Sequence, residues 1–180
     1  MEQVKTENDE ELIIQAKADS QKFAPLYNRY HNTVFRFIFR RVEDFETASD
    51  LTSQVFIKAI QNIHQYQFKG FAFSSWLIRI GLNEISMYFR KNKGNRVISI
   101  ETINAGEIME ALLRDKEDFK ILENALAKLK EVELQLIEMR FFEEMSFKSI
   151  GEILEITENN AKVKTYRIID KLKVLFKKLS

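Results

Sequence analysis

The amino-acid sequence predicts an all-α protein of two small helical domains, the second of which is a helix-turn-helix. Only 5 Gly and 1 Pro occur among the 180 residues, so little material is available for the tight turns of a sheet. Leu, Ile, Lys, Glu and Phe are abundant, and apolar residues recur at helical spacing along most of the chain. One stretch, 97–116, has no sustained period and separates the two periodic parts.

The first domain is expected at residues 1–96 and contains four predicted helices. Apolar residues at helical spacing predict the first three, over 9–18, 23–42 and 46–63. Gly70 and several aromatic residues then interrupt the pattern. The fourth helix, capped by Ser74 or Ser75, carries apolar residues inward and ends in the basic sequence RKNKGNR.

The second domain is expected at residues 117–180, after a linker at 97–116. Its predicted helices lie at 117–129, 132–143, 147–154 and 158–178. The last two are separated by a tight turn at 155–157, and Thr157 is the predicted N-cap of the final helix. This arrangement is typical of a helix-turn-helix.

The composition excludes several classes of function. Without Cys the chain has no disulfide, thiolate nucleophile or Cys-bound zinc, and two His do not build a typical zinc site. We find no nucleophile constellation or phosphate-binding Gly loop, so we expect no enzyme and no cofactor. No apolar run reaches the roughly 18 residues of a membrane span, and the acidic N-terminus is unlike a secretory signal. We therefore expect a cytoplasmic protein without membrane contact of its own.

The net charge of +1 hides two basic segments. Residues 21–96 carry +7 and residues 161–180 carry +6, while the segments between and before them are acidic. Clustered cations favour a polyanion, because binding releases counterions from it. The alternative is that these charges belong to ordinary solvated helix faces.

The final helix separates into two faces at 100° per residue. The predicted inward face consists of Ala161, Thr165, Ile168, Ile169, Leu172, Leu175, Phe176 and Leu179. The predicted outward face consists of Asn159, Asn160, Lys162, Val163, Tyr166 and Arg167. Asn bonds adenine, Arg or Lys bonds guanine, and a Val methyl contacts thymine, while Lys164 and Lys171 are placed to contact phosphates. The alternative is an amphipathic helix with a solvated Lys face, although such a face gains nothing from an exposed Val or Tyr.

Aromatic and basic residues alternate in a second segment, 66–96. Rings beside cations suit unpaired bases, since each base has a stackable face and a phosphate. The alternative is that the rings close the end of a helical core, an interpretation we favour for Phe73 and Trp76. Asn83 lies among apolar helix positions, so its amide is expected to bond either a neighbouring backbone group or a base.

Three segments in order resemble a known family. DLTSQVFIKAIQNI (50–63), FSSWLIRIGLNEISMYFRK (73–91) and the stretch 129–173 containing SFKSIGEILEITENNAKVKTYRIIDKLK resemble the bacterial sigma-70 factors, specifically their small extracytoplasmic-function group. The resemblance implies that the first domain binds the clamp of core RNA polymerase and melts the minus-ten promoter element. It also implies that the second domain recognises the minus-thirty-five element as duplex, and that an anti-sigma factor inhibits the protein.

The resemblance also implies roles for individual residues. The positions matching the polymerase-docking helix are Asp50, Leu51, Gln54 and Phe56, the last of which fits the apolar core equally well. The positions matching minus-ten recognition and melting are Phe68, Lys69, Phe71, Asn83, Met87, Arg90 and Lys91. The positions matching duplex recognition are Asn159, Asn160, Lys162, Val163, Lys164 and Arg167.

Some positions depart from the family pattern. Ser53-Gln54 stands where the family commonly has Gln-Glu, so a usual negative charge is missing from the docking helix. Gly151 replaces a common Ala, at an expected cost of about 1 kcal/mol of helix propensity. Two other classes of function stay open: a stand-alone helix-turn-helix regulator that needs no polymerase, and an adaptor that joins proteins only.

Overall fold

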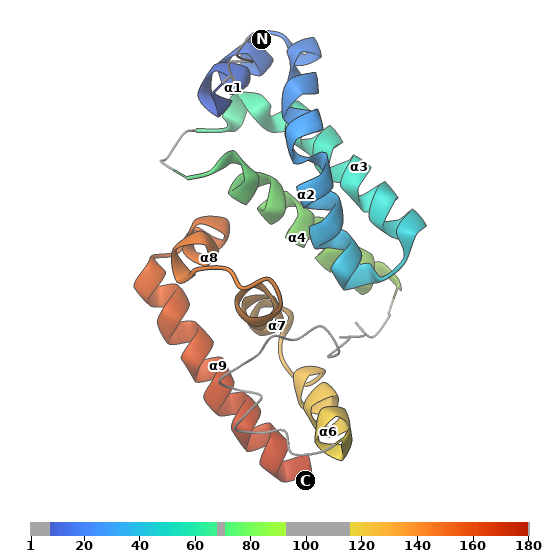
Figure 1. Cartoon of the computed structure of the whole chain (residues 1–180), viewed down its shortest axis with the longest axis vertical. Helices are drawn as coiled ribbons and strands as arrows, with labels where there is room; N and C mark the ends of the chain where they lie inside the picture. Colours follow the sequence, from blue (N-terminus) through green and yellow to red (C-terminus); the bar gives the residue numbers. More distant parts are fainter. Residues whose placement is uncertain (1–7, 68–70, 93–115, 180) are drawn as a thin grey trace, which may run out of the picture. The chain divides into compact units, whose positions relative to one another are not determined.

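The computed structural model describes residues 8–67, 71–92 and 116–179. Within these ranges the chain is helical and contains no strand, which confirms the predicted all-α class. Contacts divide the chain into two compact units, Met1–Tyr88 and Phe89–Ser180, and each unit is described by itself (Figure 1). The predicted linker lies outside the described residues except for Lys116.

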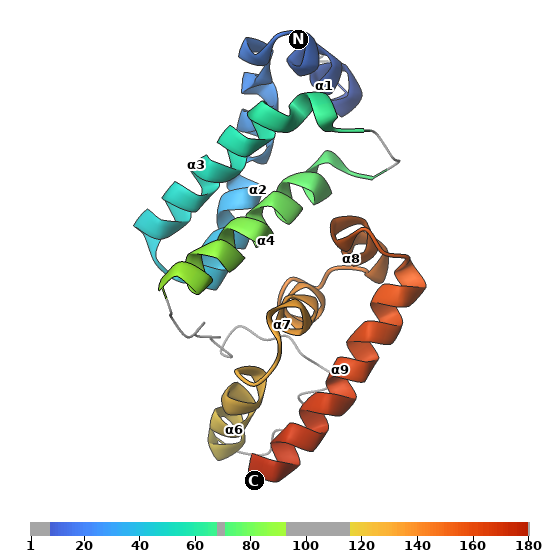
Figure 2. The ribbon, with the colours of Figure 1, turned by 180° about the vertical axis from the view of Figure 1, so that it is seen from behind.

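The helices of the first unit agree closely with the predicted ranges. They are α1 (Asp9–Ala18), α2 (Ala24–Val42), α3 (Phe45–Asn62) and α4 (Phe73–Asn92), the last of which continues for four residues past the boundary at Tyr88. Single turns of 3-10 helix, Ser20–Phe23 and Ile63–Gln65, precede α2 and follow α3. α3 packs along α2, and α4 lies beside this pair when it is seen from either side (Figures 1 and 2).

Local chemistry explains where these helices begin and end. Pro25 occupies the first turn of α2, where its missing N–H costs nothing. Asp44 caps α3 by accepting a hydrogen bond from the Thr47 N–H at 2.7 Å. α4 begins at Phe73, before the serines, and the Ser75 N–H bonds the backbone of Ala72. The predicted cap at Ser74 or Ser75 is therefore wrong.

The first unit has one apolar core between its helices. Fully buried members come from every helix: Leu12 and Ala16 of α1, Leu26 and Ile38 of α2, Val55 and Ala59 of α3, and Leu77 and Ile85 of α4. Tyr27 of α2 is 39% exposed, and its ring packs against Phe56 of α3 at the edge of the core.

The second unit contains shorter helices around one long helix. They are α6 (Lys116–Leu126), α7 (Glu131–Ile137), α8 (Phe147–Leu154) and α9 (Glu158–Leu179). α6, α7 and α8 all pack against α9, whose inner face supplies much of the core. The prediction for α9, 158–178, is correct to within one residue at its end.

The predicted helix at 132–143 is only partly an α-helix. After Ile137 the chain continues as a π-helix, Glu138–Phe142, and the Glu143 N–H bonds the Glu138 carbonyl at 3.1 Å. Residue spacing does not reveal such a change of winding, because the apolar residues continue to alternate with polar ones. The π-helix ends the second predicted helix and leads into the turn before α8.

The turn between α8 and α9 requires a glycine one turn earlier. Glu155 adopts a left-handed conformation (φ 54°), and the Ile156 N–H returns to the Gly151 carbonyl at 2.9 Å. A Cβ atom on Gly151 would lie 2.7 Å from the Ile156 carbonyl oxygen, which is closer than a real contact allows. Helix propensity alone counts Gly151 as a cost, but the close approach of the backbone explains why this residue is glycine.

The described part of the chain offers no helix that could cross a membrane, since none combines sufficient length with sufficient apolar character.

Candidate nucleic-acid interface

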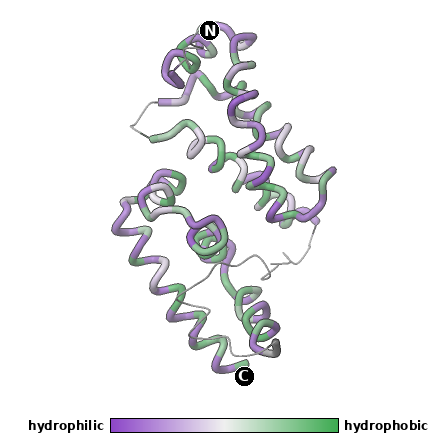
Figure 3. The backbone as a smooth tube through the Cα atoms, viewed as in Figure 1, coloured by the Kyte–Doolittle hydropathy of each residue, from purple (hydrophilic) through white to green (hydrophobic). Residues whose placement is uncertain are grey.

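The final helix of the helix-turn-helix presents a polar outer face. Thr157 caps it as predicted, because its Oγ1 accepts a hydrogen bond from the Asn160 N–H at 3.2 Å. All six residues proposed for duplex recognition are exposed: Asn159, Asn160, Lys162, Val163, Lys164 and Arg167. Figure 3 shows hydrophilic and hydrophobic positions alternating along α9, as expected for a helix with one buried face.

The opposite face of α9 holds the helix in place. Its buried residues are Ala161, Thr165, Ile168, Ile169, Leu172 and Phe176, all of which were predicted to point inward. The Thr165 hydroxyl donates to the Ala161 carbonyl at 2.9 Å, so this buried polar group is satisfied. The buried face therefore fixes which side chains α9 turns to the solvent.

Tyr166 is supported by a stack of side chains from the rest of the second unit. Its ring centre lies 6.2 Å from that of Phe147, and the Arg140 guanidinium lies 4.7 Å from the centre of the Phe147 ring. Arg140 also donates to the Met145 carbonyl at 2.9 Å. Arg140, Phe147 and Tyr166 line a cavity of about 170 Å³ beside α9. The sequence placed Tyr166 outward, but nothing in its spacing revealed the stack.

Lys171 does not extend the polar face in the way that was expected. Its Nζ lies 2.6 Å from a carboxylate oxygen of Glu133 on α7, and this contact holds the pKa of Glu133 below its ordinary value. Glu133 also accepts a hydrogen bond from the Lys130 N–H at 2.8 Å. Lys171 thus joins α9 to the beginning of α7, which leaves Lys164 as the exposed flanking lysine.

A second polar and basic stripe lies along α4. Asn83, Met87, Arg90 and Lys91 are spaced so that they share one helix face, and all four are exposed. The Asn83 amide bonds no side chain or backbone group among the described residues. The sequence left two partners open for this amide, a neighbouring backbone group or a base. The described residues contain no backbone partner, so the base stays as the prediction.

The aromatic residues just before α4 and in its first turn divide into core and surface. Tyr66 and Phe73 are buried, with ring centres 5.2 Å apart, and Trp76 lies against both. Burial raises the pKa of the Tyr66 hydroxyl. The burial of Phe73 and its contact with Trp76 support the core interpretation for these two residues. Phe71 is 38% exposed, whereas Phe68 and Lys69 lie outside the described residues.

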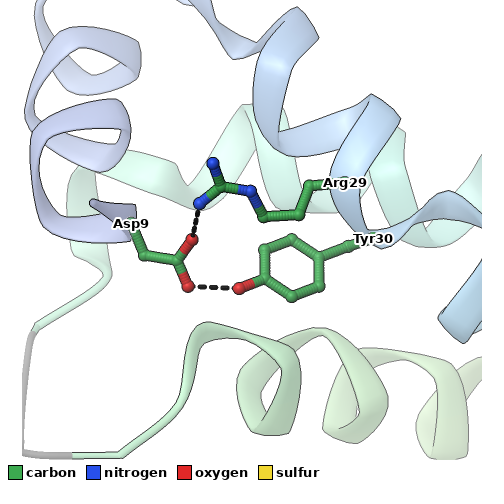
Figure 4. Close-up of polar contacts among 3 residues, drawn as sticks. All are labelled: Asp9, Arg29 and Tyr30. Atoms are coloured by element: carbon green, nitrogen blue, oxygen red, sulfur yellow. Dashed lines mark hydrogen bonds and ion pairs between the residues drawn. The ribbon is translucent and has the colours of Figure 1, made fainter. Parts of the chain in front are cut away.

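An ionic cluster joins α1 to α2 beside these rings. The Asp9 carboxylate accepts hydrogen bonds from the Arg29 guanidinium and from the Tyr30 hydroxyl (Figure 4). Burial, followed by the hydrogen bond to Asp9, raises the pKa of Tyr30 well above its ordinary value. The Tyr30 ring in turn lies 5.6 Å from that of Phe73. This cluster leaves no local signal in the sequence, because Asp9 is 20 and 21 residues away from its partners.

The proposed docking residues on α3 divide into surface and core. Asp50 and Gln54 are exposed and Leu51 is partly exposed. Phe56 is only 2% exposed, and its ring packs against those of Tyr27 and Phe23. Of the two roles that the sequence left open for Phe56, the core role fits, so we remove this residue from the docking surface.

Both units match models of one protein family. The Sigma-70 region 2 model matches residues 26–95, and the Sigma-70 region 4 model matches residues 119–172, so together they cover more than half of the chain. The first match contains α3, α4 and all but the first two residues of α2, and the second contains α8 and α9 up to residue 172.

Curated relatives with sigma-factor names span most of the chain. The ECF RNA polymerase sigma factor BldN of Streptomyces coelicolor is 27% identical over 165 residues, which are 88% of this chain and 62% of BldN. The chain therefore covers less than two thirds of that relative. The ECF RNA polymerase sigma factor SigM of Bacillus subtilis is 26% identical over 153 residues, which are 84% of this chain and 93% of SigM.

Solved structures show a similar fold. CnrH, in complex with the cytosolic domain of CnrY, has a TM-score of 0.55 at 18% identity, covering 94% of this chain and 97% of that chain. The sigma factor RpoE of Bartonella quintana, in complex with the anti-sigma factor NepR, has a TM-score of 0.51 at 16% identity, covering 87% of this chain and 98% of that chain.

Proposed function

Because the chain belongs to the sigma-70 family of RNA polymerase sigma factors, we propose that it directs core polymerase to promoters through two separate DNA contacts. The second unit recognises duplex at the upstream, minus-thirty-five element, and the first unit captures bases at the minus-ten element. The chain catalyses nothing on its own and supplies specificity to the polymerase. The observation that carries this proposal is the exposed amide and cationic face of α9 within a helix-turn-helix.

Duplex recognition follows from the chemistry of the outer face of α9. Asn159 and Asn160 lie in its first turn, where a helix inserted in the major groove meets base edges. Arg167 and Lys162 supply donors for guanine, and Val163, which is 39% exposed, supplies a methyl contact for thymine. Lys164 contacts phosphate and fixes the register.

Strand opening follows from the chemistry of α4 and the aromatic segment. Removing one base from a duplex costs a few kcal/mol, and stacking on an exposed ring such as Phe71 offsets part of this cost. The exposed Asn83 amide offers donors and an acceptor to a base edge. Arg90 and Lys91, which lie on the same face of α4, attract the DNA phosphates. Capture of one or two bases biases melting but does not complete it without polymerase contacts.

Polymerase and an inhibitor are the protein partners of this function. Asp50, Leu51 and Gln54 form the docking surface on α3 that remains once Phe56 is assigned to the core. CnrH and the Bartonella RpoE were each solved with a bound partner protein, named as an anti-sigma factor for RpoE. By the same logic an anti-sigma factor restrains this chain, which works in the cytoplasm with its polymerase.

Run-off transcription with core polymerase on a random-sequence promoter library tests the proposal. We expect promoter-directed transcripts only when the chain is present, and weak promoter binding by the chain alone. The stand-alone regulator is the competing hypothesis, because the same helix-turn-helix serves both functions. It would be favoured if the chain alone bound duplex at nanomolar affinity and gave no transcript with polymerase.

Two substitutions on α9 test its orientation. Arg167→Ala should weaken holoenzyme binding to the selected upstream element by about 1–3 kcal/mol and relax sequence preference at one position. Lys164→Ala should weaken binding to all sequences alike and reduce the slope of log affinity against log salt by about 1. An unchanged footprint in both variants would show that the outer face of α9 does not contact DNA.

A further inference from the structure

α1 has no role in the function proposed so far. It precedes residue 26, where the match to the region 2 model begins. Nevertheless it is firmly packed: Leu12, Ile13 and Ala16 are buried, and α1 contacts both α2 and the turn at Ile63–Gln65. Two of its polar residues, one near each end, make long-range hydrogen bonds: Asp9 bonds Arg29 and Tyr30 of α2, and Lys17 bonds the Tyr66 carbonyl.

The N-terminal end of α1 is linked to Phe73 through Tyr30. Asp9 lies in the first turn, where the helix dipole stabilises a carboxylate. It accepts hydrogen bonds from Arg29 and from the Tyr30 hydroxyl (Figure 4). These bonds hold the Tyr30 ring against Phe73, the first residue of α4.

The C-terminal end of α1 contacts Tyr66 directly. The Lys17 Nζ donates to the Tyr66 carbonyl at 2.5 Å and lies 5.9 Å from the centre of the Tyr66 ring. Tyr66 follows the last turn after α3, so its carbonyl has no helical partner and requires a donor. The Tyr66 hydroxyl in turn donates to the Phe71 carbonyl through a long hydrogen bond of 3.5 Å.

From these contacts we infer that α1 is a brace that positions Tyr66, Phe71 and Phe73 for base capture, and that Lys17 is its principal positioning residue. Lys17 holds Tyr66 directly, and Asp9 holds Phe73 through the Tyr30 ring. Phe71 is bonded to Tyr66 through its carbonyl, while its ring stays exposed. Ordering these residues before DNA binds removes an entropic cost that would otherwise oppose capture. The inference rests on the proposed function, since it concerns the same minus-ten contact.

Substitutions at Lys17 separate this role from simple stabilisation. Lys17→Met keeps the length of the side chain but removes the donor, whereas Lys17→Arg keeps a cationic donor. Lys22→Met, at an exposed lysine in the neighbouring 3-10 turn, is the matched control. Each variant is assembled with core polymerase on a promoter selected by the wild-type holoenzyme. Permanganate reactivity of minus-ten thymines then measures opening, and footprinting measures upstream protection.

We expect Lys17→Met to lower minus-ten reactivity about tenfold, as loss of a charge-assisted hydrogen bond would allow. Upstream protection and polymerase affinity should stay near wild type at temperatures where the variant is folded. Lys17→Arg should recover most of the opening, and Lys22→Met should behave as wild type.

Two results would overturn the inference. One is normal opening by Lys17→Met. The other is a parallel loss of opening, upstream protection and polymerase binding, which would show that α1 only stabilises the unit. If wild-type holoenzyme opened no promoter at all, the proposed function itself would fail, and this inference with it.

Discussion

Gly151 shows how one residue changes meaning between sequence and structure. Helix propensity alone predicts that Gly151→Ala stabilises α8 by about 1 kcal/mol. The added Cβ would lie 2.7 Å from the Ile156 carbonyl oxygen, and this oxygen belongs to the backbone of the turn, which cannot move as a flexible side chain does. We therefore expect Gly151→Ala to destabilise the second unit by about 1–3 kcal/mol, as strain in packed positions does.

Urea unfolding followed by circular dichroism measures this effect. Gly81→Ala is the matched control, because its Cβ would lie 3.7 Å from Val55 and 3.9 Å from Ile38, at ordinary contact distances. Gly81→Ala should be neutral or stabilising. Stabilisation by Gly151→Ala would show that propensity, and not the close turn, dominates at that position.

Single residues also show the limit of sequence patterns. Thr157 was predicted correctly as a cap, because capping depends on residues close in the chain. Phe56 could be assigned neither to the core nor to the surface from its own spacing. Its role depends on Tyr27 and Phe23, which lie on other elements and reach it only through tertiary packing.

At the scale of elements, helix positions were predictable because apolar spacing records which face is buried. The six buried residues of α9 were all on the predicted inner face. The π-helix at Glu138–Phe142 was not predictable, since it changes hydrogen bonding without changing the apolar pattern. The braces between elements, such as Asp9 with Tyr30 and Lys171 with Glu133, join residues far apart in sequence and leave no local signal.

The contact between α7 and α9 predicts a pH dependence of stability. Lys171 holds the pKa of Glu133 below its ordinary value of 4.5, so the folded state favours the ionised carboxylate. The stabilisation is fully present above that ordinary value and is lost as the pH falls through the lowered one. Glu133→Gln should therefore cost about 0.5–1 kcal/mol at neutral pH, a modest value because the pair is partly exposed.

Urea titrations of wild type and Glu133→Gln at a series of pH values measure this contribution. The difference in unfolding free energy between the two proteins should shrink as the pH falls below 4.5. Glu131→Gln, at an exposed acid in the same first turn, should show little change across the series. A difference for Glu133→Gln that stayed constant with pH would exclude an ionic contribution from the pair.

At the scale of the whole molecule, the two units contribute distinct chemistry. The outer face of α9 offers amides and cations in the geometry that suits paired bases, and the residues around α4 combine a basic stripe with one exposed ring. A promoter that is contacted at two places gains specificity from each contact, because the free-energy differences between right and wrong sequences add where the two sites are independent. Substitutions in one unit should therefore affect one step of initiation and leave the other step largely intact.

Asn83→Ala tests this division of labour. The amide is exposed and bonds no described protein group, so its removal should not disturb the fold and should act only where a base is captured. We expect open-complex formation by the holoenzyme, measured by permanganate reactivity, to fall by about 5–30-fold, which corresponds to roughly 1–2 kcal/mol for one hydrogen-bonding group. Protection of the upstream element in a footprint should remain, because α9 belongs to the other unit.

Asn28→Ala, at an exposed amide on α2, serves as the control and should leave both steps unchanged. Equal loss of opening and of upstream protection in Asn83→Ala would mean that the two units do not act separately, since an amide on α4 would then be needed for the first contact with duplex. Retention of upstream protection with impaired opening would place Asn83 after recruitment, at the step where paired bases become single-stranded.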